Sequence, residues 1–180
     1  SDSSSKISQL SFLDLVEKGN CYHKESPALW CNECLTSIAQ AELETKTVKT
    51  TFNYVNFKTV EDNEEFTIAT TRPELLPAIV CVFVNPSDEK HNHLIGKTAH
   101  IPVVDVEVPI MADEKVAADK GTGVVMCCTF GDQTDIEWWK KYNLPLKYIF
   151  TEDGRIIDSV PNYGGMKIKE ARKQIIEDLQ

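Results

Sequence analysis

The chain has 180 residues, of which 42% are hydrophobic and 26% charged, so it has the composition of an ordinary globular domain with a buried core. It has no run of about 18 apolar residues and no basic and apolar leader, which argues against a membrane protein and against a secretory signal. Its net charge of −9 argues against a protein that grips nucleic acid through a broad basic surface.

The six cysteines indicate free thiols rather than a disulfide framework. Cys127 and Cys128 are adjacent, no export signal is visible, and a chain of this length does not need cross-links to be stable. The sequence therefore predicts a protein of a reducing, cytoplasmic compartment.

The first 36 residues are predicted to form a helix and an irregular connector, separate from a main domain at residues 37–180. Apolar residues recur at helical spacing before a Gly-Asn stop at residues 19–20, namely Ile7, Leu10, Leu13 and Val16. The connector that follows contains Pro27, Trp30 and a Cys-Asn-Glu-Cys turn.

The Cys-x-x-Cys turn of Cys31 and Cys34 is a possible half of a zinc site. Cys21 and His23 are the only nearby side chains that could complete four ligands. A single Cys-x-x-Cys pair is a weak signal, so unligated thiols are the favoured alternative and no metal is expected.

Several short β-branched and apolar runs then predict strands, and many short strands suggest a barrel. The predicted strands are residues 45–60, with a slip in the alternation at Tyr54-Val55 such as a bulge or a bend produces, and residues 66–70, 79–84, 99–103, 106–111 and 124–128. Residues 132–142 are predicted to be helical, residues 148–157 a hairpin that turns at Asp153-Gly154, and the last segment a helix with one apolar face.

A threonine-rich motif, Ala-Thr-Thr-Arg-Pro-Glu, ends one predicted strand at residues 69–74. It places the hydroxyls of Thr70 and Thr71 beside the guanidinium of Arg72 at a strand end, where binding groups are common. Pro73 fixes its own φ and disfavours helix at Arg72, so the strand should stop here and these groups could face a cleft. The alternative is a plain strand edge that turns through Arg-Pro, because threonine is ordinary strand material.

A second motif combines a Gly-Thr-Gly turn at residues 121–123, an apolar strand, and a segment that leads into the helix at residue 132. Asp132 and Asp135 are three residues apart and therefore share a face at the helix start. An acid there is usually only a cap. A carboxylate held in this position could instead bind an ammonium group through a charge-assisted hydrogen bond.

The other chemistry-bearing side chains form no recognisable pattern. His91, His93 and His100 lie in polar surroundings and make no triad, and Trp138-Trp139 suits packing better than base stacking. The sequence has no nucleophile elbow, Walker loop or Rossmann glycine pattern, so no cofactor is expected.

Taken together, these segments resemble the editing insertion, or connective peptide, of class I valyl-, isoleucyl- and leucyl-tRNA synthetases. The resemblance covers roughly residues 30–145 and lies in the order of five short motifs, at residues 70–74, 82–86, 93–97, 108–113 and 121–125. The Trp-Cys-x-x-Cys segment and the Gly-Asp-x-Thr-Asp segment at residues 131–135 look most like valyl enzymes of the archaeal type.

The resemblance implies a mixed α/β, mainly β fold, an editing β-barrel with peripheral helices that acts as an aminoacyl-tRNA ester hydrolase. For a valine enzyme the substrate is threonyl-tRNA(Val), because an apolar pocket separates valine poorly from its hydroxyl isostere and a second site must finish the discrimination. The implied partners are the aminoacylated 3′ end of tRNA(Val) and the catalytic and anticodon-binding parts of a parent synthetase, with no membrane. The chain itself resembles no ATP-using site.

The resemblance also implies roles for particular residues. Asp135 would hold the substrate α-ammonium, and Thr70 and Thr71 would line the pocket around the ester and the terminal adenosine. These three are the implied catalytic residues, and Arg72 and Asp132 would support them.

Three positions depart from the commoner family pattern. Leu75 stands in place of a threonine, Gly131 in place of a histidine and Met126 in place of a lysine, while Met126 and Cys128 leave the chemistry of the substrate pocket open. Without a histidine as base, a water positioned by pocket groups and assisted by the free ribose hydroxyl is favoured over a side-chain nucleophile. An isoleucyl- or leucyl-type editing domain and a noncatalytic insertion that positions tRNA remain open alternatives.

Overall fold

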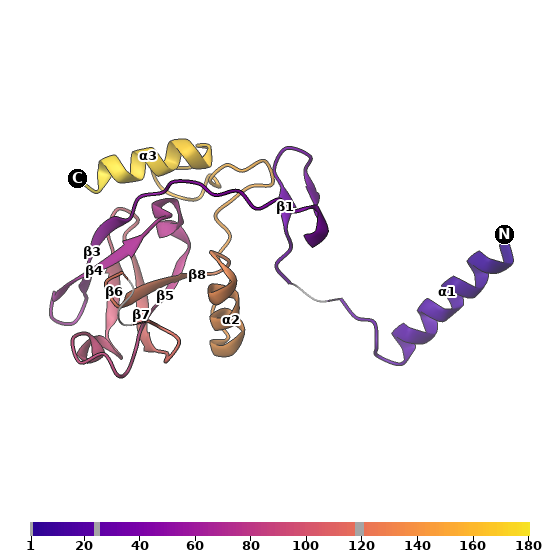
Figure 1. Cartoon of the computed structure of the whole chain (residues 1–180), viewed down its shortest axis with the longest axis horizontal. Helices are drawn as coiled ribbons and strands as arrows, with labels where there is room; N and C mark the ends of the chain where they lie inside the picture. The colour runs from indigo at the N-terminus through magenta and orange to yellow at the C-terminus, as the bar shows by residue number, and fades with distance from the viewer. Residues whose placement is uncertain (1, 24–25, 118–120) are drawn as a thin grey trace.

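Six strands form one sheet at the centre of the computed structural model, which describes residues 2–23, 26–117 and 121–180 (Figure 1). Their spatial order is β4 (Glu65–Thr70), β3 (Asn53–Thr59), β6 (Thr98–Ile101), β7 (Val106–Ala112), β5 (Ile79–Val84) and β8 (Val124–Cys128). Neighbours are antiparallel except β5 and β7, which are parallel. The outermost strands, β4 and β8, also contact each other, so the sheet is almost closed into a barrel.

The helices lie at the periphery of this barrel. The long ones are α1 (Asp2–Glu17), α2 (Gln133–Tyr142) and α3 (Ile168–Asp178), and the short 3₁₀ turns are η1 (Gln40–Glu42), η2 (Pro73–Ala78) and η3 (Asn92–Leu94). A small hairpin, β1 (Trp30–Cys31) and β2 (Thr36–Ser37), precedes the barrel. The predicted fold class, mainly β with peripheral helices, is confirmed. Among the described helices, none combines the length and the apolar character needed to cross a bilayer.

Strand β5 lies at the heart of the core, because all six of its side chains are buried. On one face its side chains join the barrel interior, where Phe57 and Phe66 meet edge to face at 5.8 Å. On the other face Phe83 stacks on Trp138 of α2, with ring centroids 4.5 Å apart. Burial on both faces explains the unbroken apolar run of β5, and the stacked pair fixes α2 against the barrel.

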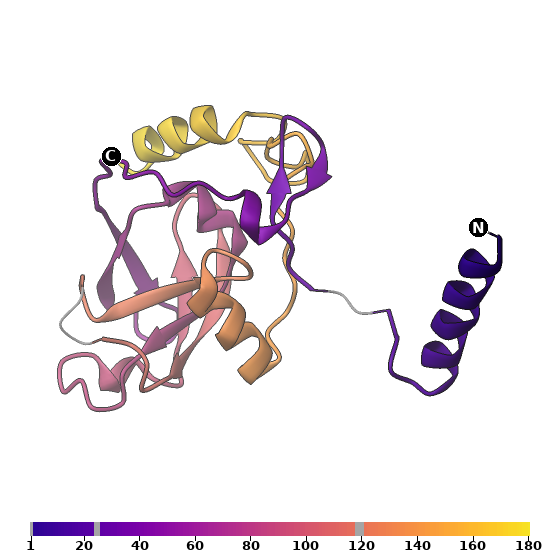
Figure 2. The same ribbon diagram turned by 45° about the vertical axis from the view of Figure 1, so that its right-hand side comes forward.

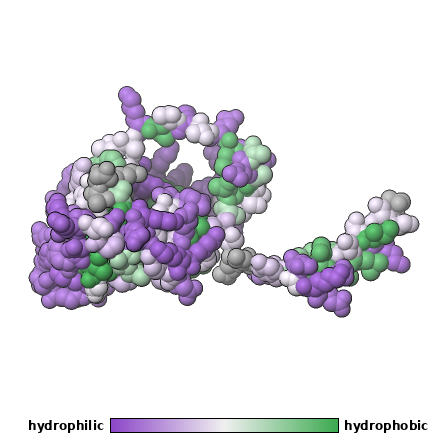
Figure 3. Space-filling model, turned by 60° about the horizontal axis from the view of Figure 1, so that its bottom comes forward, coloured by the Kyte–Doolittle hydropathy of each residue, from purple (hydrophilic) through white to green (hydrophobic). Residues whose placement is uncertain are grey.

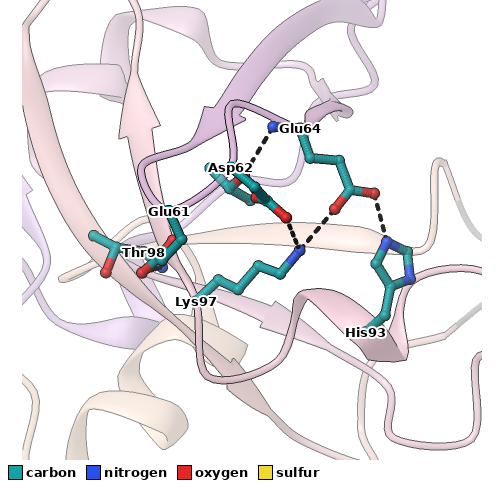
Figure 4. Close-up of polar contacts among 7 residues, drawn as sticks. Glu61, Asp62, Glu64, His93, Lys97 and Thr98 are labelled. Atoms are coloured by element: carbon teal, nitrogen blue, oxygen red, sulfur yellow. Dashed lines mark hydrogen bonds and ion pairs between the residues drawn. The ribbon is translucent and has the colours of Figure 1, made fainter.

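A charged cluster joins the β3–β4 turn to the segment before β6 (Figure 4). The ammonium of Lys97 donates to Asp62 at 2.9 Å and to Glu64 at 2.8 Å, and Nε2 of His93 lies 2.6 Å from Glu64. The contacts with Lys97 and then His93 hold the pKa of Glu64 below its usual value. These acids are paired with cations, so the cluster stabilises the turn by mutual ion pairing.

The prediction of one strand over residues 45–60 is wrong for its first half. Strand β3 begins only at Asn53, and residues 45–52 are extended and exposed. Of the bulge or bend predicted at Tyr54-Val55, the bulge is wrong, because β3 pairs with β4 without a break from Asn53 to Lys58. Strand propensity reflects packing on a sheet, and residues 45–52 have no neighbouring strand to pair with.

Helix α1 confirms the predicted N-terminal helix but contributes nothing to the barrel core. Figures 1 and 2 show it lying apart from the barrel. Apolar side chains appear along it in Figure 3, and the large exposed ones are Ile7, Leu10, Phe12, Leu13, Leu15 and Val16. A helix that packs against nothing else rarely exposes this many large apolar side chains to water.

Replacement of Phe83 by alanine should destabilise the domain severely. Phe83 is fully buried, so the variant loses its buried area and leaves a cavity behind α2, and we expect a loss of about 3–5 kcal/mol of unfolding free energy. Urea denaturation measures this loss. Tyr148→Ala, at a side chain that is 63% exposed, is the control and should change stability by less than about 0.5 kcal/mol. Equal stability of the two variants would contradict the proposed packing of α2.

Candidate functional site

The two motifs singled out in the sequence meet at one cavity of about 410 Å³. The wall includes the ends of β4 and β8 and the start of α2. All seven predicted site residues lie on it, namely Thr70, Thr71, Arg72, Met126, Cys128, Asp132 and Asp135. Residues more than 50 positions apart in the chain are therefore brought together, while the roles assigned to them stay predictions.

The threonine-rich motif forms its part of the wall where β4 ends. As predicted, the strand stops at Thr70, and Pro73 begins the turn η2. The hydroxyl of Thr70 accepts a hydrogen bond from the backbone N–H of Arg72 at 3.1 Å, which closes the turn. This contact uses a lone pair of the Thr70 oxygen and not its proton.

Asp132 and Asp135 form a reciprocal cap at the start of α2. Asp132 accepts from the backbone N–H of Asp135 at 3.0 Å, and Asp135 accepts from the backbone N–H of Asp132 at 3.1 Å. Both carboxylates therefore do act as helix caps, as acids at a helix start usually do. Asp135 is nevertheless on the cavity wall and only 8% exposed, so capping does not remove its carboxylate from the site.

Burial, reinforced by the negative charge of Asp132, raises the pKa of Asp135 to about 7. Hydrogen bonds from the Cys127 thiol and from backbone N–H groups oppose this shift only in part. An ammonium group placed beside this carboxyl group would favour its ionised form and lower its pKa again. The site is therefore suited to bind a cation.

Gly131 leaves the space in which the Asp135 carboxylate sits. A Cβ atom at residue 131 would lie 2.2 Å from Oδ2 of Asp135 and 3.4 Å from a methyl carbon of Leu75. Because the hydrogen bond to Asp132 holds that carboxylate, a side chain at residue 131 would have to displace it. The departures at Gly131 and Leu75 thus belong to one packing arrangement around Asp135.

The buried carboxylate of Glu74 links the threonine-rich motif and the segment before α2 to α3, through two arginines. Glu74 is 4% exposed and lies between Arg72, at 3.4 Å, and Arg172 of α3, at 3.2 Å. Its Oε2 receives no well-aligned hydrogen bond, so the contact with Arg172 is an ion pair. Arg72 also donates to the carbonyl of Gly131 at 2.7 Å, and Arg172 donates to the carbonyl of Thr71.

Sequence reasoning missed Arg172 and Phe52. Arg172 lies about a hundred residues from the motif it supports, and its only sequence signal was a carboxylate after Arg-Pro that needs a second cation once buried. Phe52 is half exposed at the edge of the cavity, and the neighbouring Asn53 amide donates to the carbonyl of Thr70 at 3.3 Å. Phe52 belongs to the segment that was predicted as strand.

The cysteine-rich turn stands apart from this cavity. The backbone N–H of Cys34 donates to the sulfur of Cys31 at 3.4 Å, which lowers the pKa of the Cys31 thiol. Within residues 2–23, 26–117 and 121–180, no three His, Cys, Asp or Glu side chains gather as metal ligands. Cys21 and His23 therefore do not complete a site around this turn in the described structure.

Residues 84–180 match the sequence model of the family described as leucyl-tRNA synthetase, editing domain. The chain belongs to this family of editing domains. It is 49% identical to a valine–tRNA ligase of Haloarcula marismortui over 97% of the chain, and 53% identical to one of Rickettsia rickettsii over 98%. The chain spans about a fifth of the length of these relatives, 20% and 22%.

A solved structure supports the fold of the editing domain. The LeuRS of Agrobacterium radiobacter K84, in a ternary complex with tRNA and LeuAMS, matches 71% of this chain and 18% of its own, with a TM-score of 0.58 at 18% identity. At that identity the likeness concerns the fold alone. The resemblance predicted from the five motifs, including the likeness to valine–tRNA ligases, is confirmed by the relatives.

The stability of the editing domain should fall between about pH 4 and pH 7. The folded pKa of Asp135 is raised, so its contribution is fully present below the unfolded pKa and is lost as pH rises through about 7, roughly 4 kcal/mol in all. Urea denaturation across this range should show the fall, and Asp135→Asn, which keeps a cap acceptor, should flatten it. Parallel curves for both proteins would show that Asp135 titrates normally.

Replacement of Arg172 by alanine should destabilise the domain, because the buried Glu74 carboxylate would keep only one of its two cationic partners. Because Arg172 is 39% exposed, we expect Arg172→Ala to lose about 1–3 kcal/mol of unfolding free energy. Adding Glu74→Gln should recover part of that loss, since a neutral amide needs no cation. A double-mutant cycle by urea denaturation measures the coupling. Lys173→Ala, 81% exposed on the same helix, is the control, and an Arg172 variant as stable as this control would refute the role of the ion pair.

Proposed function

We propose that this editing domain hydrolyses the ester bond of mischarged threonyl-tRNA(Val). The observation that carries the proposal is the convergence of Thr70, Thr71 and Asp135 on one cavity, with the Asp135 carboxylate buried on its wall. The similarity to valine–tRNA ligases supports the choice of tRNA(Val). The products are free threonine and a tRNA whose terminal ribose hydroxyl is restored.

Asp135 holds the α-ammonium of the threonyl group in this mechanism. Its raised pKa means that the free site does not carry a fixed unpaired charge, and the ammonium restores ionisation when the substrate binds. The resulting pair anchors the amino acid at one end. Thr70 and Thr71, on the same cavity wall, then face the ester.

Water is the nucleophile in this mechanism, because Cys128, the one cysteine on the described cavity wall, does not suit that role. Cys128 is fully buried, its thiol lies 3.5 Å from the carbonyl of Leu75, and burial raises the pKa of that thiol well above its usual value. Water adds to the ester carbonyl carbon and gives up a proton, the bond to the ribose oxygen breaks, and that oxygen takes up a proton in turn. The neighbouring ribose hydroxyl assists by orienting the water.

The proposed partners are the aminoacylated 3′ end of tRNA(Val) and the catalytic and anticodon-binding parts of a longer cytoplasmic synthetase. The relatives support this arrangement, since the chain matches about a fifth of each, 20% and 22%. The exposed apolar side chains of α1 also suit a helix that packs against further protein.

Deacylation assays with the synthetase that carries this chain test the proposal. The unsubstituted enzyme should hydrolyse threonyl-tRNA(Val) and spare valyl-tRNA(Val). Asp135→Ala should slow threonyl hydrolysis by at least ~30-fold, because it removes one partner of a buried charge pair. Glu89→Ala, which removes an exposed carboxylate, is the matched control.

Two outcomes would contradict the proposal. If the unsubstituted enzyme leaves threonine attached but deacylates isoleucyl- or leucyl-system substrates, the assigned specificity is wrong. If it deacylates none of them, the domain is a noncatalytic insertion.

A further inference from the structure

Residues 45–60 form a basic stretch of an acidic chain. This stretch holds three lysines and no Asp or Glu, although the whole chain has a net charge of −9. Its second half is β3, where Lys58 pairs with Glu65 at 3.1 Å. Its first half, residues 45–52, is extended and exposed, and we call it the strap. The lysines of the strap, Lys46 and Lys49, point their charge at solvent.

The strap leads directly to the cavity. In Figures 1 and 2 it crosses above the barrel beside α3 and continues into β3. Its last residue, Phe52, is 50% exposed and lies on the cavity wall. The amide of Asn53 donates to the carbonyls of Thr51 and Thr70, both at 3.3 Å, which fixes Phe52 beside the threonine-rich motif.

Cations that alternate with exposed aromatic rings are the features that bind single-stranded nucleic acid without reading its sequence. Lysines contact the phosphates, and each ring offers a face on which a base can stack. The strap offers two such lysines and one such ring, Phe52, and it ends at the cavity where an aminoacyl ester would sit.

We propose that the strap binds the single-stranded 3′ end of the tRNA. Lys46 and Lys49 contact its phosphates, and Phe52 stacks on the terminal base, which delivers the ester to Thr70 and Asp135. This inference rests on the proposed deacylation, because it supplies the path by which the substrate reaches that site.

The lysines are tested by the salt dependence of threonyl-tRNA(Val) hydrolysis by the synthetase. For Lys46→Ala/Lys49→Ala, the slope of log kcat/KM against log salt should become shallower by about 1.4, or about 0.7 for each phosphate that a lysine no longer neutralises. Hydrolysis of threonyl-adenosine, which has no phosphates, should not change. Lys169→Ala/Lys173→Ala on α3 removes the same charge from another exposed surface and should keep the original slope.

Phe52 is tested with both substrates. Phe52→Ala should reduce kcat/KM for threonyl-tRNA(Val) and for threonyl-adenosine by roughly 5- to 100-fold, because both contain the base, and Phe52→Trp should restore it.

Equal salt slopes for the two double-lysine variants would overturn the proposal. Equal reductions in rate on both substrates in the strap lysine variant would do the same, and would indicate that the strap packs against another part of the synthetase. If the unsubstituted enzyme hydrolyses neither substrate, deacylation itself fails. The same variants are then compared by the salt dependence of tRNA(Val) binding, where equal slopes again exclude the strap.

Discussion

The carboxylate of Glu74 is almost fully buried, and a charge in such a place is tolerated only when cations surround it. Arg72 and Arg172 meet this requirement from different parts of the chain, one from the turn after β4 and the other from α3. Each arginine also bonds to a backbone carbonyl at the cavity, that of Gly131 and that of Thr71. Pairing one carboxylate thus fixes three separate segments around a single site, and the last helix of the domain becomes part of its architecture.

Asp132 and Asp135 show that a structural and a functional interpretation of one motif need not compete. Each carboxylate caps a backbone N–H of the other residue, so the start of α2 is stable without substrate. Burial and the nearness of the two acids raise the pKa of Asp135, which leaves it receptive to a cation. The cap orients the Asp135 carboxylate, while its burial and the nearby Asp132 favour the binding of a cation to it.

Local chemistry made much of this molecule predictable. The order of short motifs indicated the family, and Pro73 correctly marked the end of β4 because proline constrains its neighbour whatever the rest of the fold does. The strand prediction for residues 45–52 was wrong, because threonine and valine favour a strand only where another strand is available for pairing. Arg172 could not be found because its partner is 3.2 Å away in space but about a hundred residues away in sequence, and nothing on α3 distinguishes it from solvent-facing cations.

The close approach of residue 131 to the Asp135 carboxylate has a consequence for how this family can vary. A Cβ at that position would lie 2.2 Å from the carboxylate oxygen, so a histidine there and this carboxylate geometry are mutually exclusive. The two positions are therefore linked: a side chain at 131 can be accommodated only if the Asp135 carboxylate moves. A histidine placed there would require the Asp135 carboxylate to turn away from its hydrogen bond with the backbone N–H of Asp132.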